Sequence, residues 1–520
     1  MTPKYTLYIG TFVHLPREKT GERHELAIHR GALWVSAADG RIKGFDWSIS
    51  NDGDLQDLIE RHGWATEGSN WAGGRPRVKV VRAREENNEF FFPGFIDTHI
   101  HAPQYPNAGL FGILTLLDWL KKYTFPVEKS FHDTRQAHTV YNRIITRTLA
   151  NGTTCASYFA TIHVPATNIL ATLCKQRGQR ALIGRVCMDR VETTPPDYRD
   201  PSPQESISLN YDVINHVKTI DPHGTYVKPI ITPRFALACT EPAMRGLAAL
   251  AQEYKPPLHI QTHISENKNE VCEVECMYKM KYAEVYEHFG LLTPRTILAH
   301  AVHLSEQERR IISGHRSKIS HCPASNSALG SGLCPVRYLL DDDITVGLGT
   351  DVSGGYDASI LENVREACLV SRLYRHTDPE IDDKEARRIM LSVADALYLA
   401  TRGGAAVVDM ADEIGGFDRD MSWDAQLISL GPTVEKRPKR WTDDSPVDIF
   451  EKEEKNWPEK IEKWVWNGDD RNVSAVWVHG KLVHRRGDEH GKCCRHGWKW
   501  VWGAGLAGVG ALFVLRRMRS

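Results

Sequence analysis

FPGFIDTHIH, at residues 92–101, is the stretch from which the architecture of this chain can be worked out. Pro93-Gly94 is typical of a turn, and the residues after it favour a β-strand because several are β-branched or aromatic. Side chains alternate between the faces of a strand, so His99 and His101 are expected to point the same way. Two neutral imidazoles at a strand end can bind one divalent metal ion. An isolated His-x-His pair is more often two histidines on a polar sheet face, so the rest of the chain has to decide.

From Pro93 onward, short apolar segments rich in β-branched residues alternate with helical segments. The predicted strands are 94–100, 153–159, 180–188, 226–232, 257–263, 296–300, 317–320 and 344–349. The predicted helices are 133–150, 166–177, 206–219, 241–254, 269–288, 305–314 and 360–373. About eight alternations over about 300 residues are typical of an α/β fold of the (β/α)8 TIM-barrel class. We therefore assign residues 93–401 to a catalytic barrel domain, with its chemistry at the C-terminal strand ends.

The segments that flank the barrel are rich in short strand signals. Residues 1–92 contain several, with one helix predicted near 55–61, and strand signals return at 425–430 and 473–484. We expect residues 1–92 and 402–490 to pair into one small β-sandwich domain. Within 435–465, Pro458 opens a charged amphipathic helix, and the sequence gives this segment no role.

Composition limits the classes of protein that fit. The chain has 520 residues, 41% hydrophobic and 25% charged, which is ample for a large core. The formal net charge of -1 gives no electrostatic argument for a nucleic-acid partner. The 11 cysteines are scattered without framework spacing, and the first residues show neither a long apolar run nor a cleavage signal. These features predict a reducing, cytoplasmic setting.

Polar residues end the later strands of the predicted barrel. His263 ends one strand, His300 ends the next, and Asp351 follows the last. Together with the His-x-His pair they suit a mononuclear zinc or iron site that keeps one position open for water. His300 as a buried core histidine and Asp351 as a helix cap are the alternatives. Such residues at successive strand ends, in chain order, are difficult to explain as coincidence.

The residue types at these strand ends predict a hydrolytic reaction. A bound metal lowers the pKa of its water towards about 7. Glu266, three residues after His263, is the candidate proton shuttle from the water to a ring nitrogen. The alternative for Glu266 is a carboxylate in the first turn of a helix, where the helix dipole favours it. His300 is expected to polarise or position the water, and a nearby cation would keep Asp351 ionised.

Six segments resemble the amidohydrolase superfamily and, within it, the enzymes that deaminate guanine. They are PGFIDTHIHAPQYPNAG, NGTTCASYFATIH, ITPRFALAC, QTHISEN, GLGTDVSGGY and NGDDRN, and they extend from about residue 90 to 480. The resemblance implies one zinc per chain, with iron as the other possibility, held by His99, His101, His263 and Asp351. It also implies that His300 lies beside the metal and that the protein is a homodimer.

The same resemblance implies contacts with a purine base. Gln104, Arg234 and Phe235 are the implied base contacts, with His101, His263 and Asp351 facing the substrate from the metal side. Arg234 can donate to the purine carbonyl, Gln104 can read a donor and an acceptor together, and Phe235 can lie against the ring. Water would attack the carbon that bears the amine, Glu266, His300 and Asp351 would serve the reaction, and ammonia and xanthine would be released.

Two alternatives remain open on the sequence, and two others are disfavoured by it. Another deaminase of the same superfamily would act on adenine, cytosine or a triazine, and a non-catalytic scaffold would need neither the metal ligands nor Glu266. A two-metal site would need a lysine at a strand end, but Lys228 precedes the apolar part of its strand and is expected at the far end. The Pro-Cys-x-x-Cys element of nucleotide-type deaminases does not occur, because Cys322-Pro323 has the reverse order.

The C-terminal tail, residues 491–520, departs from the pattern of the soluble superfamily members that deaminate guanine. The uncharged run 501–515 would span about 22 Å as a helix, short of the roughly 30 Å hydrocarbon core. Tryptophans precede the run and arginines follow it, as they do at membrane interfaces, and Cys493-Cys494 is a candidate acylation site. Membrane contact through 498–515 and a loosely packed appendage are the two interpretations.

Overall fold

The computed structural model describes residues 3–18, 23–66, 76–437 and 445–487. The chain divides into two compact units, Met1–Arg486 and Gly487–Ser520, and the architecture below is that of the first. The predicted tail, including 498–515, lies outside the described residues. Among the helices that the structure does describe, none combines the length and the apolar character needed to cross a bilayer.

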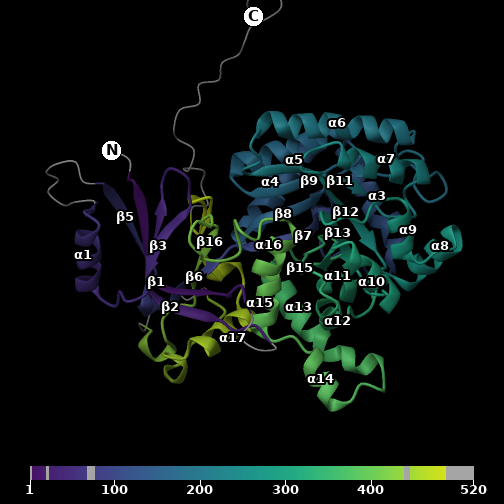
Figure 1. Cartoon of the computed structure of the whole chain (residues 1–520). Helices are drawn as coiled ribbons and strands as arrows, with labels where there is room; N and C mark the ends of the chain where they lie inside the picture. The colour runs from purple at the N-terminus through teal and green to yellow at the C-terminus, as the bar shows by residue number, and fades with distance from the viewer. Residues whose placement is uncertain (1–2, 19–22, 67–75, 438–444, 488–520) are drawn as a thin grey trace, which may run out of the picture. The chain divides into compact units, whose positions relative to one another are not determined.

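Eight parallel strands form a barrel, each hydrogen-bonded to the next (Figure 1). They are β7 (Phe95–His101), β8 (Thr153–Phe159), β9 (Arg180–Gly184), β11 (Val227–Pro233), β12 (His259–Ile264), β13 (Thr296–His300), β14 (Lys318–His321) and β15 (Val346–Leu348). The first and last strands meet where Thr98 Oγ1 donates to the Leu348 carbonyl at 2.9 Å. The predicted (β/α)8 barrel is therefore confirmed.

The barrel strands are buried on both faces, which explains their nearly continuous apolar sequence. Every residue of β7 and β8 is buried. The turn before β7 needs glycine, because a Cβ on Gly94 would lie 2.2 Å from the Thr154 Oγ1 atom. The predicted strand 180–188 is divided into β9 and a short β10 (Val186–Cys187), and β10 pairs with β11.

Helices surround the barrel as predicted, with one exception. They are α4 (Thr134–Ala150), α5 (Val164–Arg177), α6 (Pro203–Ile220), α7 (Glu241–Gln252), α10 (Glu306–Gly314) and α13 (Ile360–Leu373). The single helix predicted over 269–288 is wrong, since the structure has α8 (Lys268–Tyr278) and α9 (Tyr282–His288). Lys279 ends α8 in the left-handed conformation, φ 57°, which propensity alone does not reveal.

The segment between β7 and α4 has no predicted element, yet it folds into short helical turns. These are a turn at Ala102–Asn107, α2 (Leu116–Trp119), a wide turn at Leu120–Thr124, and α3 (Phe125–Lys129). The interruptions by proline and glycine leave no stretch long enough for a helical period to show.

The flanking segments form an additional sheet, in the order β18-β17-β16-β6-β1-β2-β3. Its strands are β1 (Tyr5–His14), β2 (Ala27–Ser36), β3 (Ile42–Asp46), β4 (Ala65–Thr66), β5 (Arg77–Arg82), β6 (Glu89–Pro93), β16 (Ala425–Ser429), β17 (Val473–Val478) and β18 (Lys481–Arg485). β6 pairs antiparallel with β16, so the two ends of the sequence share one sheet. The sheet branches at β1, which pairs with β2 on one edge and with β5 and β6 on the other. The domain limits 93 and 401 stay predictions.

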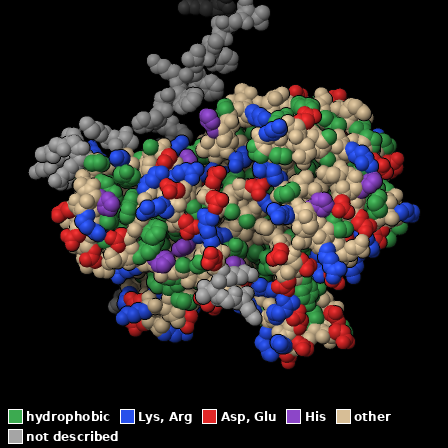
Figure 2. Space-filling model, viewed as in Figure 1, with side chains coloured by type: hydrophobic (Ala, Val, Ile, Leu, Met, Phe, Trp, Pro, Cys, Tyr) green, Lys and Arg blue, Asp and Glu red, His purple; other side chains and the backbone are tan. Residues whose placement is uncertain are grey.

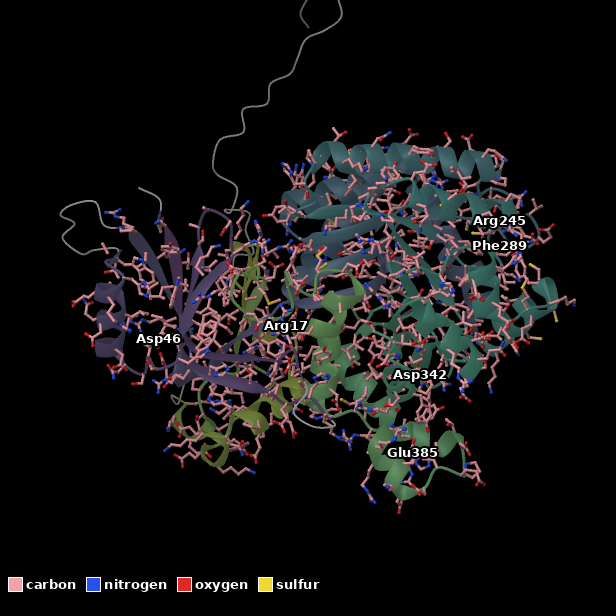
Figure 3. The ribbon with its side chains drawn as sticks, viewed as in Figure 1. Arg17, Asp46, Arg245, Phe289, Asp342 and Glu385 are labelled. Atoms are coloured by element: carbon pink, nitrogen blue, oxygen red, sulfur yellow. The ribbon has the colours of Figure 1, made fainter. Side chains whose placement is uncertain are left out.

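Ion pairs and aromatic contacts join this sheet to the barrel. At the start of β9, the Arg180 Nε atom donates to Asp424 Oδ2 at 2.6 Å, and both side chains are buried. Arg17, labelled in Figure 3, pairs with Asp418 at 2.9 Å and so joins the two flanking segments to each other. The helix predicted to start at Pro458 is α17 (Trp457–Asn467), and its Trp464 ring stacks on Phe95 with the planes 11° apart. Part of the segment 435–465 thus packs against the first residue of β7.

The outer helices make a contact between an arginine and an aromatic ring, and the surface carries side chains of both charges. Arg245 of α7 lies over the Phe289 ring beyond α9, 4.8 Å from its centre (Figure 3). On the face in Figure 2, cationic and anionic side chains of the described residues are interspersed. Such a mixed surface does not steer a strongly charged partner towards this face.

Candidate active site

The C-terminal ends of the barrel strands gather four histidines around one aspartate. His99 and His101 belong to β7, His263 to β12 and His300 to β13, and Asp351 follows β15. The Nε2 atoms of His99 and His101 lie 3.0 and 3.3 Å from Asp351 Oδ1. His101 Nε2 lies 3.1 Å from His263 Nε2. The structure therefore brings together all five residues that the sequence placed at or beside a metal.

The tightest group of ligand atoms differs slightly from the implied ligand set. One ligand atom from each of His99, His263, His300 and Asp351 lies within 4.8 Å of the others. The resemblance implied His101 as a ligand and His300 as its neighbour. Both imidazoles are buried in the cluster, so both border the same centre.

Two observations indicate that these residues fit a divalent metal ion. His99 Nε2 and His300 Nε2 are buried without a hydrogen-bond partner among the described residues. The Nδ1 atoms of His263 and His300 lie 2.6 Å from the Arg234 carbonyl and 3.0 Å from Asn326 Oδ1. A histidine that donates from Nδ1 keeps its Nε2 lone pair for a metal. Imidazoles with one carboxylate are a donor set that zinc and iron both accept.

Electrostatics favour the protonation states that bind a metal. Burial lowers the pKa of His101 to about 4, although Asp351 opposes the shift. Burial also lowers the pKa of His263 well below its usual value, and the neighbouring imidazoles add to this. Burial alone would raise the pKa of Asp351, but His99 and His101 outweigh it and hold that pKa well below its usual range. Neutral imidazoles beside an ionised carboxylate are the metal-binding forms.

Asp97 supports the cluster and was not assigned a role from the sequence. Its Oδ1 accepts from the backbone N–H groups of His99 at 3.2 Å and Thr350 at 3.0 Å. Its Oδ2 accepts from Thr350 Oγ1 at 2.5 Å. Asp97 therefore ties β7 to the residue before Asp351. Burial raises the pKa of Asp97 to about 7, against the opposing effect of the Thr350 bonds. Its position in the FPGFIDTHIH motif was the only signal.

Glu266 lies beside the cluster, in a position suited to proton transfer. Its Oε2 lies 3.4 Å from His300 Nε2, and its Oε1 accepts from Ser331 Oγ at 3.3 Å. Burial, together with the charge of Asp351, raises the pKa of Glu266 well above its usual value. Helix α8 is capped by Asn267 and its first-turn carboxylate is Glu270, so Glu266 does not lie in the first turn.

A cavity opens from the cluster towards the segment that follows β7. Its empty space, counting the open mouth, is about 390 Å³. Its lining includes the predicted residues Gln104, Arg234, Phe235, Glu266 and His300, together with the apolar Leu116, Trp119, Leu120 and Leu329. No lysine occurs in this lining, and Lys228 is the second residue of β11, at the opposite end of that strand from Arg234.

Behind the wall of the cavity lies Glu128, which sequence reasoning missed. It accepts from Arg234 Nη1 at 2.6 Å and Nη2 at 3.1 Å, and from Gln104 Nε2 at 2.8 Å. Tyr198 donates to it as well, at 2.9 Å. A single glutamate in a stretch without periodicity gives no signal that it is buried, so no sequence pattern could have identified it.

A parallel barrel with this histidine-rich centre, and with a protonatable carboxyl beside it, defines the class of metal-dependent hydrolases. Residues 90–483 match the model of the Amidohydrolase family, and the chain belongs to this family. The resemblance seen in the sequence is therefore confirmed.

Relatives with assigned names narrow the comparison. The chain is 47% identical to the probable guanine deaminase of Schizosaccharomyces pombe, over 76% of this chain and 71% of that protein. It is 40% identical to the guanine deaminase of Homo sapiens, over 93% of this chain and 97% of that protein. The crystal structure of guanine deaminase from C. acetobutylicum with guanine in its active site superimposes with a TM-score of 0.75. That match has 29% identity and covers 92% of this chain and all of the other.

Proposed function

We propose that this protein deaminates guanine with water, releasing xanthine and ammonia. One observation carries the proposal: hydrogen-bond donors of Arg234 and Gln104 line the same cavity as Glu266 and the histidine cluster. A base that reached both sides would place a carbonyl at the donors and an amine-bearing carbon at the cluster. The guanine deaminases named above support the same assignment.

We propose that one zinc ion per chain occupies the cluster, with His99, His101, His263 and Asp351 as ligands. His300, whose ring belongs to the tightest group of ligand atoms, would lie beside the ion. When bound, a divalent metal lowers the pKa of its water towards about 7 and so supplies the nucleophile. The position of Lys228 supports one ion rather than two. Metal analysis of the purified chain tests both the number and the element.

Glu266 is assigned the first proton transfer. Its raised pKa suits a carboxyl that takes a proton from water and passes it to the ring nitrogen beside the attacked carbon. The oxygen then forms its bond to that carbon, and the ring carries the proton. Asp351, which is ionised, takes the proton of the added hydroxyl and passes it to the amine. The carbon–nitrogen bond breaks, ammonia leaves, and a carbonyl remains.

On the other side of the cavity, Arg234, Gln104 and Phe235 hold the base. Arg234 presents N–H groups and no acceptor, so it favours a carbonyl oxygen over an amine at that position. The Phe235 ring is 7% exposed and offers an apolar face to the heterocycle. Trp119, Leu116 and Leu120 add apolar wall that excludes water.

The alternatives differ in what they would need from the cavity. An adenine deaminase must accept a base that has no carbonyl, and a cytosine deaminase must accept a single-ring base. Triazine hydrolase from Arthrobacter aurescens aligns at 17% identity, which is evidence for the fold alone. A non-catalytic scaffold would not explain why, in the described part of the chain, buried histidine nitrogens beside a cavity make no hydrogen bond.

The first experiment combines ultraviolet absorbance of guanine with an assay for released ammonia. We expect the wild type to produce xanthine and ammonia in equal amounts, and Glu266→Gln to produce neither while it keeps its metal. Adenine, cytosine and a triazine are tested in parallel. Turnover of one of these without turnover of guanine would assign the protein to the alternative deaminases.

We propose further that the protein works in the cytoplasm as a homodimer. Light scattering of the purified chain reports its mass in solution. Fractionation of cells that express the full chain or a truncation after residue 486 tests membrane contact through 498–515. A full chain that stays wholly in the soluble fraction would refute that contact.

A further inference from the structure

Four donors converge on the buried carboxylate of Glu128, behind the wall of the cavity. Arg234 follows β11, Gln104 lies in the turn after β7, and Tyr198 lies in the loop before α6. Glu128 itself belongs to α3 and is fully buried. It does not line the cavity, whereas Arg234 and Gln104 do.

The network fixes the direction of the Gln104 amide. A carboxylate only accepts, so the Gln104 nitrogen must face Glu128, at 2.8 Å. The amide oxygen then faces Ser353, whose N–H and hydroxyl lie 3.3 and 3.4 Å away. Without the charge of Glu128 the amide could turn over, which would exchange donor and acceptor on the cavity wall.

The same carboxylate fixes the Arg234 guanidinium. Two of its five N–H groups bond to Glu128 in a bidentate pair. Within the described residues no other acceptor is in hydrogen-bond contact with this side chain, so the remaining N–H groups are available to the cavity. A buried guanidinium without its carboxylate would be costly, so the pair keeps Arg234 inside the wall.

We propose that Glu128 is a positioning residue that sets the specificity of the site for a base whose carbonyl is separated from the reacting carbon by one ring nitrogen. This inference rests on the proposed function. Glu128 acts through Arg234 and Gln104 and does not touch the base. It makes that wall of the cavity donor-rich, and a donor-rich wall accepts a carbonyl oxygen and gains nothing from a C–H group.

The test compares guanine with 2-aminopurine, which carries the same amine but has a C–H group in place of the guanine carbonyl. Binding of 2-aminopurine is measured by its fluorescence, and guanine turnover by absorbance. We expect Glu128→Gln to lose at least about 100-fold in kcat/KM for guanine, because the donors lose their orientation. Its dissociation constant for 2-aminopurine should change by less than about threefold, since that base makes no bond to these donors.

A matched control is Asp424→Asn, which breaks a buried pair with Arg180, and neither residue lines the cavity. Asp424→Asn should change kcat/KM for guanine and the affinity for 2-aminopurine by the same factor. If Glu128→Gln does not fold, Tyr198→Phe decides. Tyr198→Phe removes one donor to Glu128 without changing charge and should reduce guanine turnover by about threefold, with 2-aminopurine unaffected.

Equal changes for both bases, or no change for guanine, would overturn the role of Glu128 and leave the proposed function intact. A wild type that binds neither base and leaves guanine unchanged would overturn the proposed function, and this inference with it.

Discussion

A cluster of histidine and aspartate side chains lies at each end of the barrel. The two clusters differ in whether their histidine ring nitrogens are hydrogen-bonded. At the C-terminal end, His99 Nε2 and His300 Nε2 make no hydrogen bond among the described residues, although each has a carboxylate oxygen within 3.4 Å. At the N-terminal end, His259 Nε2 bonds to Asp409 at 2.9 Å, and Arg295 Nη2 bonds to His259 Nδ1 at 3.2 Å. Similar residue types thus form a candidate active site at the C-terminal end and a stabilising ion-pair cluster at the N-terminal end.

The N-terminal cluster is built for stability. Lys318 also bonds to Asp409, and Arg295 Nη1 lies 3.6 Å from it. These four residues join the starts of β12, β13 and β14 to the turn after α16 (Gly404–Val407). Burial would raise the pKa of Asp409, but His259 and Lys318 lower it to about 2. In barrels of this kind, function lies at the C-terminal face and the N-terminal face stabilises the fold.

The largest expected effect is at the C-terminal cluster, with Asp351→Asn. We expect kcat/KM for guanine to fall at least about 1000-fold, or about 4 kcal/mol, because the proposed metal ligand and proton acceptor are lost together. Metal content should fall as well. Without metal, the variant should unfold within about 1 kcal/mol of the wild type, because the imidazoles around Asp351 are neutral and its loss leaves no buried cation unpaired. Steady-state kinetics and denaturant unfolding in chelator measure both. A loss of stability above that limit with activity retained would reverse the assignment of the two ends.

The matched change at the other end is Asp409→Asn. It leaves Lys318 and Arg295 without their shared anion, so we expect about 3 kcal/mol less stability in denaturant unfolding. Below the unfolding transition, kcat/KM for guanine should stay within about twofold of the wild type, because no residue of this cluster lines the cavity. If activity fell while stability held, the N-terminal cluster would belong to the reaction.

His259 is expected to make the stability of the folded chain depend on pH. Burial lowers the pKa of His259 to about 4, with Arg295 and Lys318 adding to the shift and Asp409 opposing it. The unfolded chain therefore binds a proton near pH 6.5 that the folded chain does not bind until about pH 4. Stability from this group is complete above pH 6.5 and declines as the pH falls to about 4.

The measurement is stability against pH for the metal-loaded wild type and His259→Gln. We expect the wild type to lose about 2 kcal/mol more than the variant between pH 6.5 and 4. Parallel curves would mean that His259 titrates alike in the folded and unfolded chains.

Only one of these two clusters could be predicted from the sequence. The C-terminal cluster could be predicted because strand periodicity and strand order put His99, His263 and Asp351 at one face. The partnership of His259 and Asp409 could not, since neither residue stands in a motif and 150 positions separate them. Glu128 escaped for the same reason. Residues that act by position in a motif can be found from sequence, and those that act by satisfying a buried charge become visible only in the structure.

The smallest expected effect concerns Asn326, which bonds to His300 Nδ1 at 3.0 Å. Its carbonyl oxygen accepts the Nδ1 hydrogen and so aims Nε2 at the cluster. We expect Asn326→Ala to lower kcat about 10-fold with KM nearly unchanged, as for other residues that orient a histidine at a metal centre. Asn326→Asp keeps an acceptor at that position and should recover most of the loss. Ser325→Ala is the control, because the Ser325 hydroxyl is buried without a partner among the described residues and its removal breaks no bond. If Asn326→Ala and Ser325→Ala have the same kcat, packing and not the Asn326 hydrogen bond orients His300 Nε2 towards the cluster.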